Sequence, residues 1–183
     1  MPLDEIFDAA MQRFLERRRV DMRSLAVELG MGRATLYRRV GSRDQLLGQV
    51  LWQLTQRSLQ RAVKHAEGRR GADRILAVIG NFLAGVIEQP SLRHFLAAEP
   101  EAALRILTSK HGVVQPGVRA HLEGLLQEEI AAGAFIPRMD VRTLAFVLVR
   151  IGESFLYADA IADGEPDVEQ ALLVIGRLLD DQP

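Results

Sequence analysis

The chain has 183 residues, no cysteine, 48% hydrophobic residues, and 23 Lys and Arg against 24 Asp and Glu. This composition excludes a disordered chain, and the missing cysteines exclude disulfide, zinc-thiolate and iron–sulfur sites. The longest uncharged stretch, residues 75–87, is too short to cross a bilayer, and the N-terminal residues lack the pattern of a signal peptide. The composition therefore predicts a soluble, cytoplasmic protein of one or two domains.

Charge is divided unevenly along the chain. Residues 1–67 hold 12 Lys and Arg and 8 Asp and Glu, a net charge of +4, whereas residues 68–183 have a net charge of −5. A basic N-terminal part followed by an acidic remainder indicates that the N-terminal part meets a polyanion.

Apolar residues recur at spacings of three and four through the whole chain, and no β-branched alternation or hairpin turn interrupts them. This pattern predicts an all-α protein of nine or ten helices, separated by Pro and Gly residues. The expected helices span residues 3–18, 22–29, 33–40, 42–67, 72–88, 92–98, 101–110, 116–132, 141–162 and 167–180.

The second and third expected helices have the spacing of a helix-turn-helix. The turn Gly30-Met31-Gly32 joins them, and its first glycine suits the left-handed backbone that ends a helix. Ala26 is the small residue needed where the two helices cross, and Leu36 and Val40 anchor the second of them. A helix held in this way lies in the major groove of DNA and reads bases with residues near its N-terminal end.

The outer face of this helix-turn-helix carries side chains that suit DNA. Arginine favours guanine O6 and N7, threonine meets a base edge or a thymine methyl group, and a tyrosine hydroxyl contacts a phosphate. Ser42 and Gln45 form a capping box, and the helix that it opens offers an anion site at its N-terminus. The predicted DNA-binding residues are Arg23, Arg33, Ala34, Thr35, Tyr37, Arg38, Arg39, Ser42 and Arg43. An ordinary three-helix bundle with a solvated basic face is the alternative.

Residues 24–51, SLAVELGMGRATLYRRVGSRDQLLGQVL, resemble the DNA-binding signature of the tetracycline-repressor (TetR) family. Leu25-Ala26, Leu29-Gly30, Thr35-Leu36-Tyr37 and Leu46-Leu47 fill the family pattern in register. The stretch from Tyr37 to Trp52 is also similar to regulators of the QsdR type, a group linked to lactone catabolism. The rest of the chain fits the family only in length, helical content and order.

The resemblance implies a homodimer with two N-terminal DNA-binding heads and a helical body that binds a small molecule and forms the dimer interface. It implies a DNA-binding domain over residues 1–47 and an effector-binding and dimerisation domain over residues 48–183. The clearest break in the helical pattern is residues 68–71, so the long fourth helix is expected to belong to both parts. One departure from the family is that no basic arm precedes the first expected helix.

The expected helix over residues 141–162 contains an apolar run, residues 144–149, that should be buried on both faces. A two-fold mate is the simplest second partner, and the last helix would join it in a four-helix bundle across the dimer. A central core helix without a dimer role is the alternative. The predicted interface residues are Phe146, Val147, Val149, Leu172, Ile175 and Leu179.

Polar residues interrupt two otherwise apolar helices, which suggests a largely apolar pocket with a few orienting polar groups. Arg150 and Glu153 lie three apart on one helix face and, if buried, must pair with each other, with the mate or with a ligand. The predicted pocket residues are Trp52, Asn81, Phe82, His94, Phe95, Arg150, Glu153, Phe155 and Tyr157. For each of them, simple packing or a surface ion pair is the alternative.

The four histidines show no metal-ligand spacing, and no Ser-centred elbow, phosphate loop or zinc-protease motif occurs, so we expect no metal, no cofactor and no enzymatic activity. We expect a repressor that binds a pseudo-palindromic operator as a homodimer and is released by a small, mostly apolar effector, without a membrane partner. The alternatives are a DNA-binding regulator whose body serves a protein partner, a helical enzyme, and an interaction module that never meets DNA.

Overall fold

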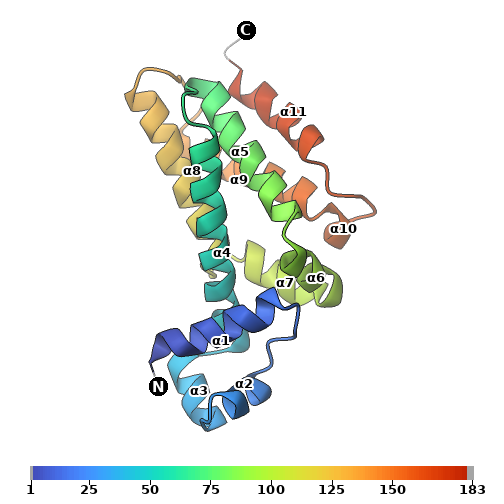
Figure 1. Cartoon of the computed structure of the whole chain (residues 1–183). Helices are drawn as coiled ribbons and strands as arrows, with labels where there is room; N and C mark the ends of the chain where they lie inside the picture. Colours follow the sequence, from blue (N-terminus) through green and yellow to red (C-terminus); the bar gives the residue numbers. More distant parts are fainter. Residues whose placement is uncertain (1, 181–183) are drawn as a thin grey trace. The chain divides into compact units, whose positions relative to one another are not determined.

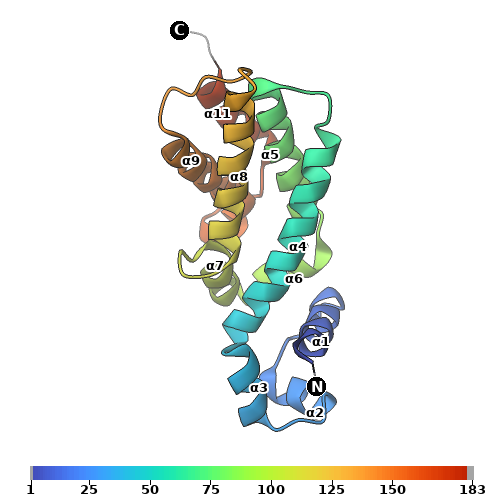
Figure 2. The ribbon, with the colours of Figure 1, turned by 90° about the vertical axis from the view of Figure 1, so that its left-hand side faces the viewer.

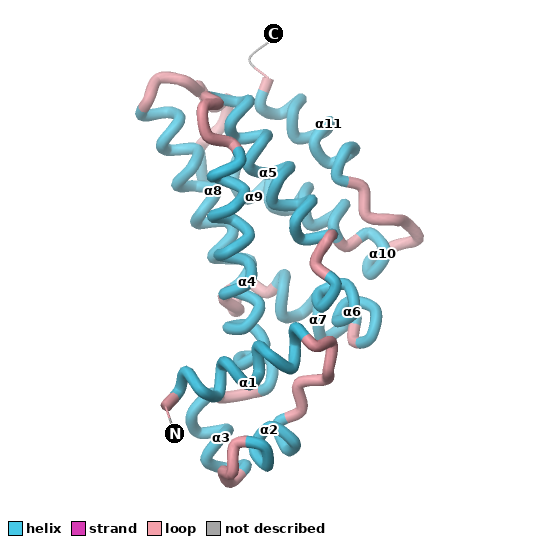
Figure 3. The backbone as a smooth tube through the Cα atoms, in the orientation of Figure 1, coloured by secondary structure: helices cyan, strands magenta, loops and turns pink. Residues whose placement is uncertain are grey.

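The structure is a computed structural model that describes residues 2–180, and these residues form eleven helices and no strand (Figures 1 and 3). The prediction of an all-α fold is confirmed. The helices are α1 (Leu3–Leu15), α2 (Met22–Glu28), α3 (Arg33–Val40), α4 (Arg43–His65), α5 (Gly71–Ile87), α6 (Pro90–Ala98), α7 (Pro100–Thr108), α8 (Val114–Ala131), α9 (Val141–Leu156), α10 (Ala158–Ile161) and α11 (Val168–Leu179).

Two helices end three or more residues earlier than their apolar pattern predicts. The first ends at Leu15 because Arg17 adopts a left-handed φ of 58°, which no continuing helix allows. The helix expected over residues 141–162 ends at Leu156, and Tyr157, with ψ at 23°, separates it from the short α10. Neither break has a Gly or Pro at the point where the helix ends, so the sequence did not signal them.

Packing divides the chain into two compact units. The first contains the described residues up to Leu54 together with Gln89–Gln115, and the second contains Thr55–Glu88 together with the residues from Pro116 onward. Helix α4 therefore contributes its first half to one unit and its second half to the other. The packing also adds α6 and α7 to the N-terminal helices, whereas the predicted division falls after residue 47.

The first unit is built on buried apolar side chains that recur along α1 to α4 and on α6 and α7. Within this unit α2 packs on α3, and the end of α1 lies against α6 (Figure 1). There the rings of Phe14 and Phe95 meet edge to face, with centroids 5.8 Å apart. The buried apolar residues of α1 to α3 are Ile6, Ala10, Met11, Phe14, Met22, Leu25, Ala26 and Leu36.

In the second unit, α11 packs against both α5 and α9 (Figure 2). Gly80 allows α5 and α11 to approach closely, because a Cβ at this position would lie 2.9 Å from the Leu172 side chain. The buried Glu129 near the end of α8 accepts a hydrogen bond from the Gly71 N–H at 2.6 Å and pairs with Arg74, so it joins α8 to the start of α5. Hydrogen bonds from these groups hold the pKa of Glu129 below its ordinary value, although burial opposes them.

Among the described residues, no single helix has the length and apolar character to cross a membrane. Helices α5 and α6 meet that test only when they are counted together, by length and composition alone.

Candidate nucleic-acid interface

Helices α2 and α3 form the predicted helix-turn-helix. The Asp21 carboxylate caps α2 by accepting hydrogen bonds from the N–H groups of Arg23 and Ser24, at 3.1 and 2.8 Å. The Ser24 N–H chiefly holds the pKa of Asp21 below its ordinary value. Gly30 has a φ of 61°, the left-handed conformation expected for the turn, and Ala26 is buried where the helices cross. Local chemistry alone therefore sets the start and the turn of this motif.

A buried arginine that the sequence did not single out joins α1 to α2. The Arg13 side chain donates to the Ser24 hydroxyl at 2.7 Å and forms an ion pair with Glu28, and Arg13 itself is buried. Both partners lie on α2, so Arg13 fixes α2 on α1 although it does not face DNA. The only sequence signal for this role is its position among the apolar residues of the inner stripe of α1.

Helix α3 presents most of the predicted DNA-binding residues outward while the fully buried Leu36 anchors it. Arg33 and Arg38 are exposed, and neither has a hydrogen-bond or ion-pair partner among residues 2–180. Tyr37 is exposed and Thr35 is half-buried. The exposed predicted residues on α2 and α3 are Arg23, Arg33, Ala34, Tyr37, Arg38 and Arg39.

The capping box predicted at the start of α4 is present. The Ser42 N–H donates to the Gln45 side-chain oxygen at 2.7 Å, and the Gln45 N–H donates to the Ser42 hydroxyl at 3.1 Å. Gly41, with a φ of 71°, separates α3 from this box. The N-terminus of α4 therefore lies directly after the C-terminus of α3. An anion bound at the N-terminus of α4 would lie next to α3, the helix predicted to enter the major groove.

Arg43 has a different environment from the other predicted residues. Its guanidinium donates to the Val20 carbonyl at 2.5 Å and to the Glu99 carboxylate at 2.7 Å, and its side chain is only 21% exposed. These bonds occupy the guanidinium within the first unit. An anion at the start of α4 would meet the backbone N–H of Arg43 and its remaining guanidinium nitrogen.

The predicted effector residues fall in both units. Trp52, His94 and Phe95 belong to the first unit, where the latter two line a cavity described below. The second unit contains the other six, which are Asn81, Phe82, Arg150, Glu153, Phe155 and Tyr157. Asn81 is exposed and Tyr157 is buried, and the effector role of the whole set stays a prediction.

Arg150 and Glu153 form the expected pair on α9. The Arg150 guanidinium donates to the Glu153 carboxylate at 2.5 Å. Burial raises the pKa of Glu153 to about 7, although Arg150 opposes this shift. The Glu153 side chain is 11% exposed, against 50% for Arg150. The pair therefore reaches from the inside of the second unit to its surface.

The predicted dimer residues differ in exposure. Val149, Ile175 and Leu179 are buried within the single chain. Phe146 is 47% exposed, and the neighbouring helix α11 adds Leu173, which is 60% exposed and was not predicted. Val147 and Leu172 are half-buried, and the dimer role of the whole set stays a prediction.

Comparisons with known proteins point to one family. A family model described as "Tetracyclin repressor-like, C-terminal domain" matches residues 70–180. The structure of the R. erythropolis transcriptional repressor QsdR, from the TetR family, is 33% identical, with a TM-score of 0.89 over 97% of this chain and 93% of that chain.

Two further solved structures share the fold at lower identity. The TetR family repressor AlkX from Dietzia sp. strain DQ12-45-1b is 24% identical, with a TM-score of 0.60 over 98% of this chain and 95% of that chain. A TetR transcription regulator from Haloarcula marismortui is 18% identical, with a TM-score of 0.58 over 97% and 96%. A search of the curated proteins finds no match.

Proposed function

The chain belongs to the TetR family of DNA-binding transcriptional regulators, so it is not an enzyme, and we propose that it is a repressor that binds an operator as a homodimer. The observation that carries the proposal is the outer face of α3, where Arg33 and Arg38 are exposed without partners among residues 2–180. Binding DNA through Arg33 and Arg38 breaks no hydrogen bond or ion pair among residues 2–180. The 33% identical relative, QsdR, is a repressor, and this supports repression rather than activation.

The proposed operator is a pseudo-palindrome read by two copies of the chain. Each copy places its α3 in the major groove of one half-site, and the half-sites are about one helical turn apart or a multiple of it. The exposed apolar side chains Phe146 and Leu173 on α9 and α11 support this pairing, because burying them between two copies removes apolar surface from water.

The proposed effector is a small, mostly apolar molecule bound by the second unit. Its binding lowers operator affinity through a coupling of about 1–3 kcal/mol, which corresponds to roughly 5- to 150-fold. The Arg150–Glu153 pair supports a polar group on this effector, since it places one ionisable carboxyl group inside the unit. The alternative is that the second unit binds a protein partner instead of a small molecule. An effector screen in which no compound changes operator affinity would favour this alternative.

The test is a fluorescence-anisotropy titration of the full chain against promoter DNA beside its own gene. The titration uses two salt concentrations and a nonspecific duplex of equal length. We expect specific binding that weakens as salt rises, because Lys and Arg contacts release counterions from the phosphates. Analytical ultracentrifugation of the complex should give two chains per site. The same signal then screens effectors by their ability to release the DNA.

A double variant, Arg33→Ala with Tyr37→Ala, tests the proposed interface. One lost guanine contact removes about 1–3 kcal/mol per half-site, so a dimer loses on the order of 30-fold or more in affinity. Arg142→Ala is the matched control, because it removes an equally exposed arginine from α9. Unchanged operator affinity in a double variant that remains folded and dimeric would refute this interface.

A further inference from the structure

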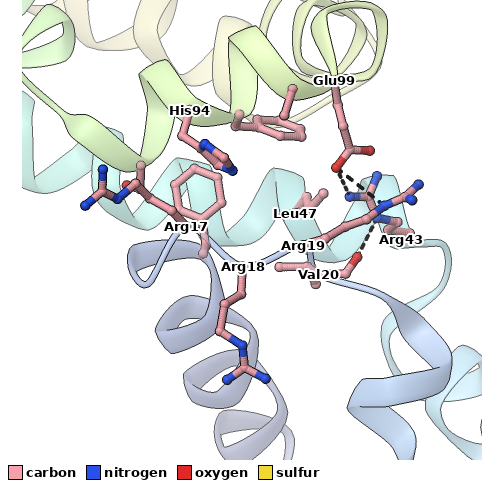
Figure 4. Close-up of a pocket in the computed structure, with 12 residues that line it drawn as sticks. Arg17, Arg18, Arg19, Val20, Arg43, Leu47, His94 and Glu99 are labelled. Carbon is pink, nitrogen blue, oxygen red and sulfur yellow. Dashed lines mark hydrogen bonds and ion pairs between the residues drawn. The ribbon is translucent and has the colours of Figure 1, made fainter.

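A cavity of about 260 Å³ lies within the first unit, away from α3 (Figure 4). The end of α1, the loop that leads to α2, the start of α4 and helix α6 line it, and it is open to solvent on one side. One side is apolar and includes the edge-to-face pair Phe14 and Phe95 together with Leu47. The loop between α1 and α2 supplies three consecutive arginines on the other side. The cavity therefore combines an apolar wall with a cationic rim.

Arg17 is placed at this rim by an unusual backbone. Its N–H donates to the Phe14 carbonyl at 3.0 Å, and the next N–H, of Arg18, donates to the Arg13 carbonyl at 2.9 Å. This pair of bonds is a helix ending that normally has glycine at the left-handed position. Among residues 2–180, Arg17 is the only non-glycine with positive φ, and its side chain has no hydrogen-bond or ion-pair partner there. The described residues thus gain no hydrogen bond or ion pair from the Arg17 side chain.

Arg19 is only loosely held. Its side chain is 74% exposed and lies 3.7 Å from the Glu99 carboxylate, whereas Arg43 donates to the same carboxylate oxygen at 2.7 Å. Arg43 therefore neutralises Glu99, and the charge of Arg19 remains available to an added anion. Figure 4 shows Arg19 reaching toward Glu99 at one end of the cavity and Arg17 lying toward His94 at the other.

We propose that this cavity binds a small monocarboxylate with an apolar body. Its volume corresponds to about nine water molecules, which suits a ligand of about ten non-hydrogen atoms. The apolar wall takes the body, and the carboxylate pairs with Arg17 or with Arg19, which lie at opposite ends of the rim, because guanidinium groups bind carboxylates through paired hydrogen bonds. The carboxylate of Glu99 in the lining disfavours a second negative charge on the ligand.

The ligand would contact the segment that positions the helix-turn-helix. The loop ends at Val20, whose carbonyl Arg43 holds, and the next residue, Asp21, caps α2. This site lies in the unit that contains α3 and is separate from the effector site proposed in the second unit. Its ligand binding is measured without DNA, so the proposal stands or fails independently of the operator.

The first measurement is isothermal titration calorimetry of the full chain with phenylacetate, which has about ten non-hydrogen atoms. Phenylacetamide is its neutral match in size and shape, and sodium sulfate supplies an anion without an apolar body. We expect phenylacetate to bind and each of the other two to bind at least about tenfold more weakly. Phenylacetamide lacks the charge-assisted hydrogen bond, and sulfate lacks the apolar contact. Failure of phenylacetate to bind at millimolar concentration, or equal binding of the amide, overturns the proposal.

Amino-acid substitutions test whether phenylacetate binds in this cavity. Arg17→Ala with Arg19→Ala should weaken phenylacetate binding at least about tenfold, and Arg23→Ala, which removes an exposed arginine of α2 that does not line the cavity, should leave it unchanged. Ala98→Leu fills the cavity from α6 without changing charge and should also weaken binding. Thermal melts check that each variant is folded. Phenylacetate binding that survives both the double variant and Ala98→Leu places the ligand elsewhere and overturns the proposal.

Discussion

Glu153 should make the chain less stable as pH rises from about 4.5 to about 7. Burial raises the pKa of its carboxyl from 4.5 to about 7 in the folded chain. The folded state therefore keeps a proton that the unfolded state releases above about pH 4.5. The stability that comes from this proton is fully present below pH 4.5 and is lost as pH rises through about 7.

The size of the effect follows from the difference of about 2.5 between the two pKa values. Each unit is worth about 1.4 kcal/mol, so the fold loses at most about 3 kcal/mol between the two ends of this pH range. For a chain of this size, that loss lowers the midpoint of thermal unfolding by about 6–12 °C. Glutamine has the shape of the protonated carboxyl, so Glu153→Gln should abolish this part of the pH dependence.

The assay is thermal unfolding followed by circular dichroism at pH 5 and pH 8. The midpoints of Glu153→Gln and the natural chain should be similar at pH 5, and the variant should unfold at a higher temperature at pH 8. Comparing two chains at each pH cancels the other titrating groups, including His121, whose pKa burial lowers. Glu165→Gln, at an exposed position, is the control. An equal difference between Glu153→Gln and the natural chain at both pH values would refute the reasoning.

Two further predictions concern stability and the helix-turn-helix. Gly71→Ala should destabilise the chain by more than about 2 kcal/mol in urea unfolding, because Gly71 has a φ of 57° and the added Cβ would lie 2.3 Å from the Ala134 carbonyl oxygen. Gly124→Ala, inside α8 with open space around it, should instead stabilise by about 0.5–1 kcal/mol, and equal effects would contradict both statements. Arg13→Ala should weaken operator binding in the anisotropy assay, because it frees α2 from α1 and leaves Glu28 unpaired. Full operator affinity in that variant would show that α2 holds its place without Arg13.

The fold could be predicted from sequence wherever local chemistry decides it. The Asp21 cap, the left-handed Gly30 and the Ser42–Gln45 box are interactions between residues at most three apart, and all occur as expected. Arg17 shows the limit of such reasoning. A residue that normally disfavours positive φ ends α1 there, and only the packed structure reveals it.

The predicted sites depend on contacts that a sequence pattern does not contain. Apolar periodicity identified α9 and α11, but it cannot say which apolar face turns toward the chain's own core. Ile175 therefore looked like an interface residue and is buried, while Leu173 is exposed. Likewise Arg43 looked like a free DNA contact because its partner Glu99 is 56 residues away.

The Arg43–Glu99 ion pair connects α6 and α7 to the DNA-binding helices. Two ion pairs join the start of α4 to this later segment, Arg43 with Glu99 and Arg105 with Asp44. The second is largely exposed and is worth less than about 1 kcal/mol. The first is four-fifths shielded from water and shares its guanidinium with the Val20 carbonyl, one residue before the cap of α2. A displacement of Glu99 therefore changes the support of both α2 and α4, whereas a displacement of Arg105 reaches only α4.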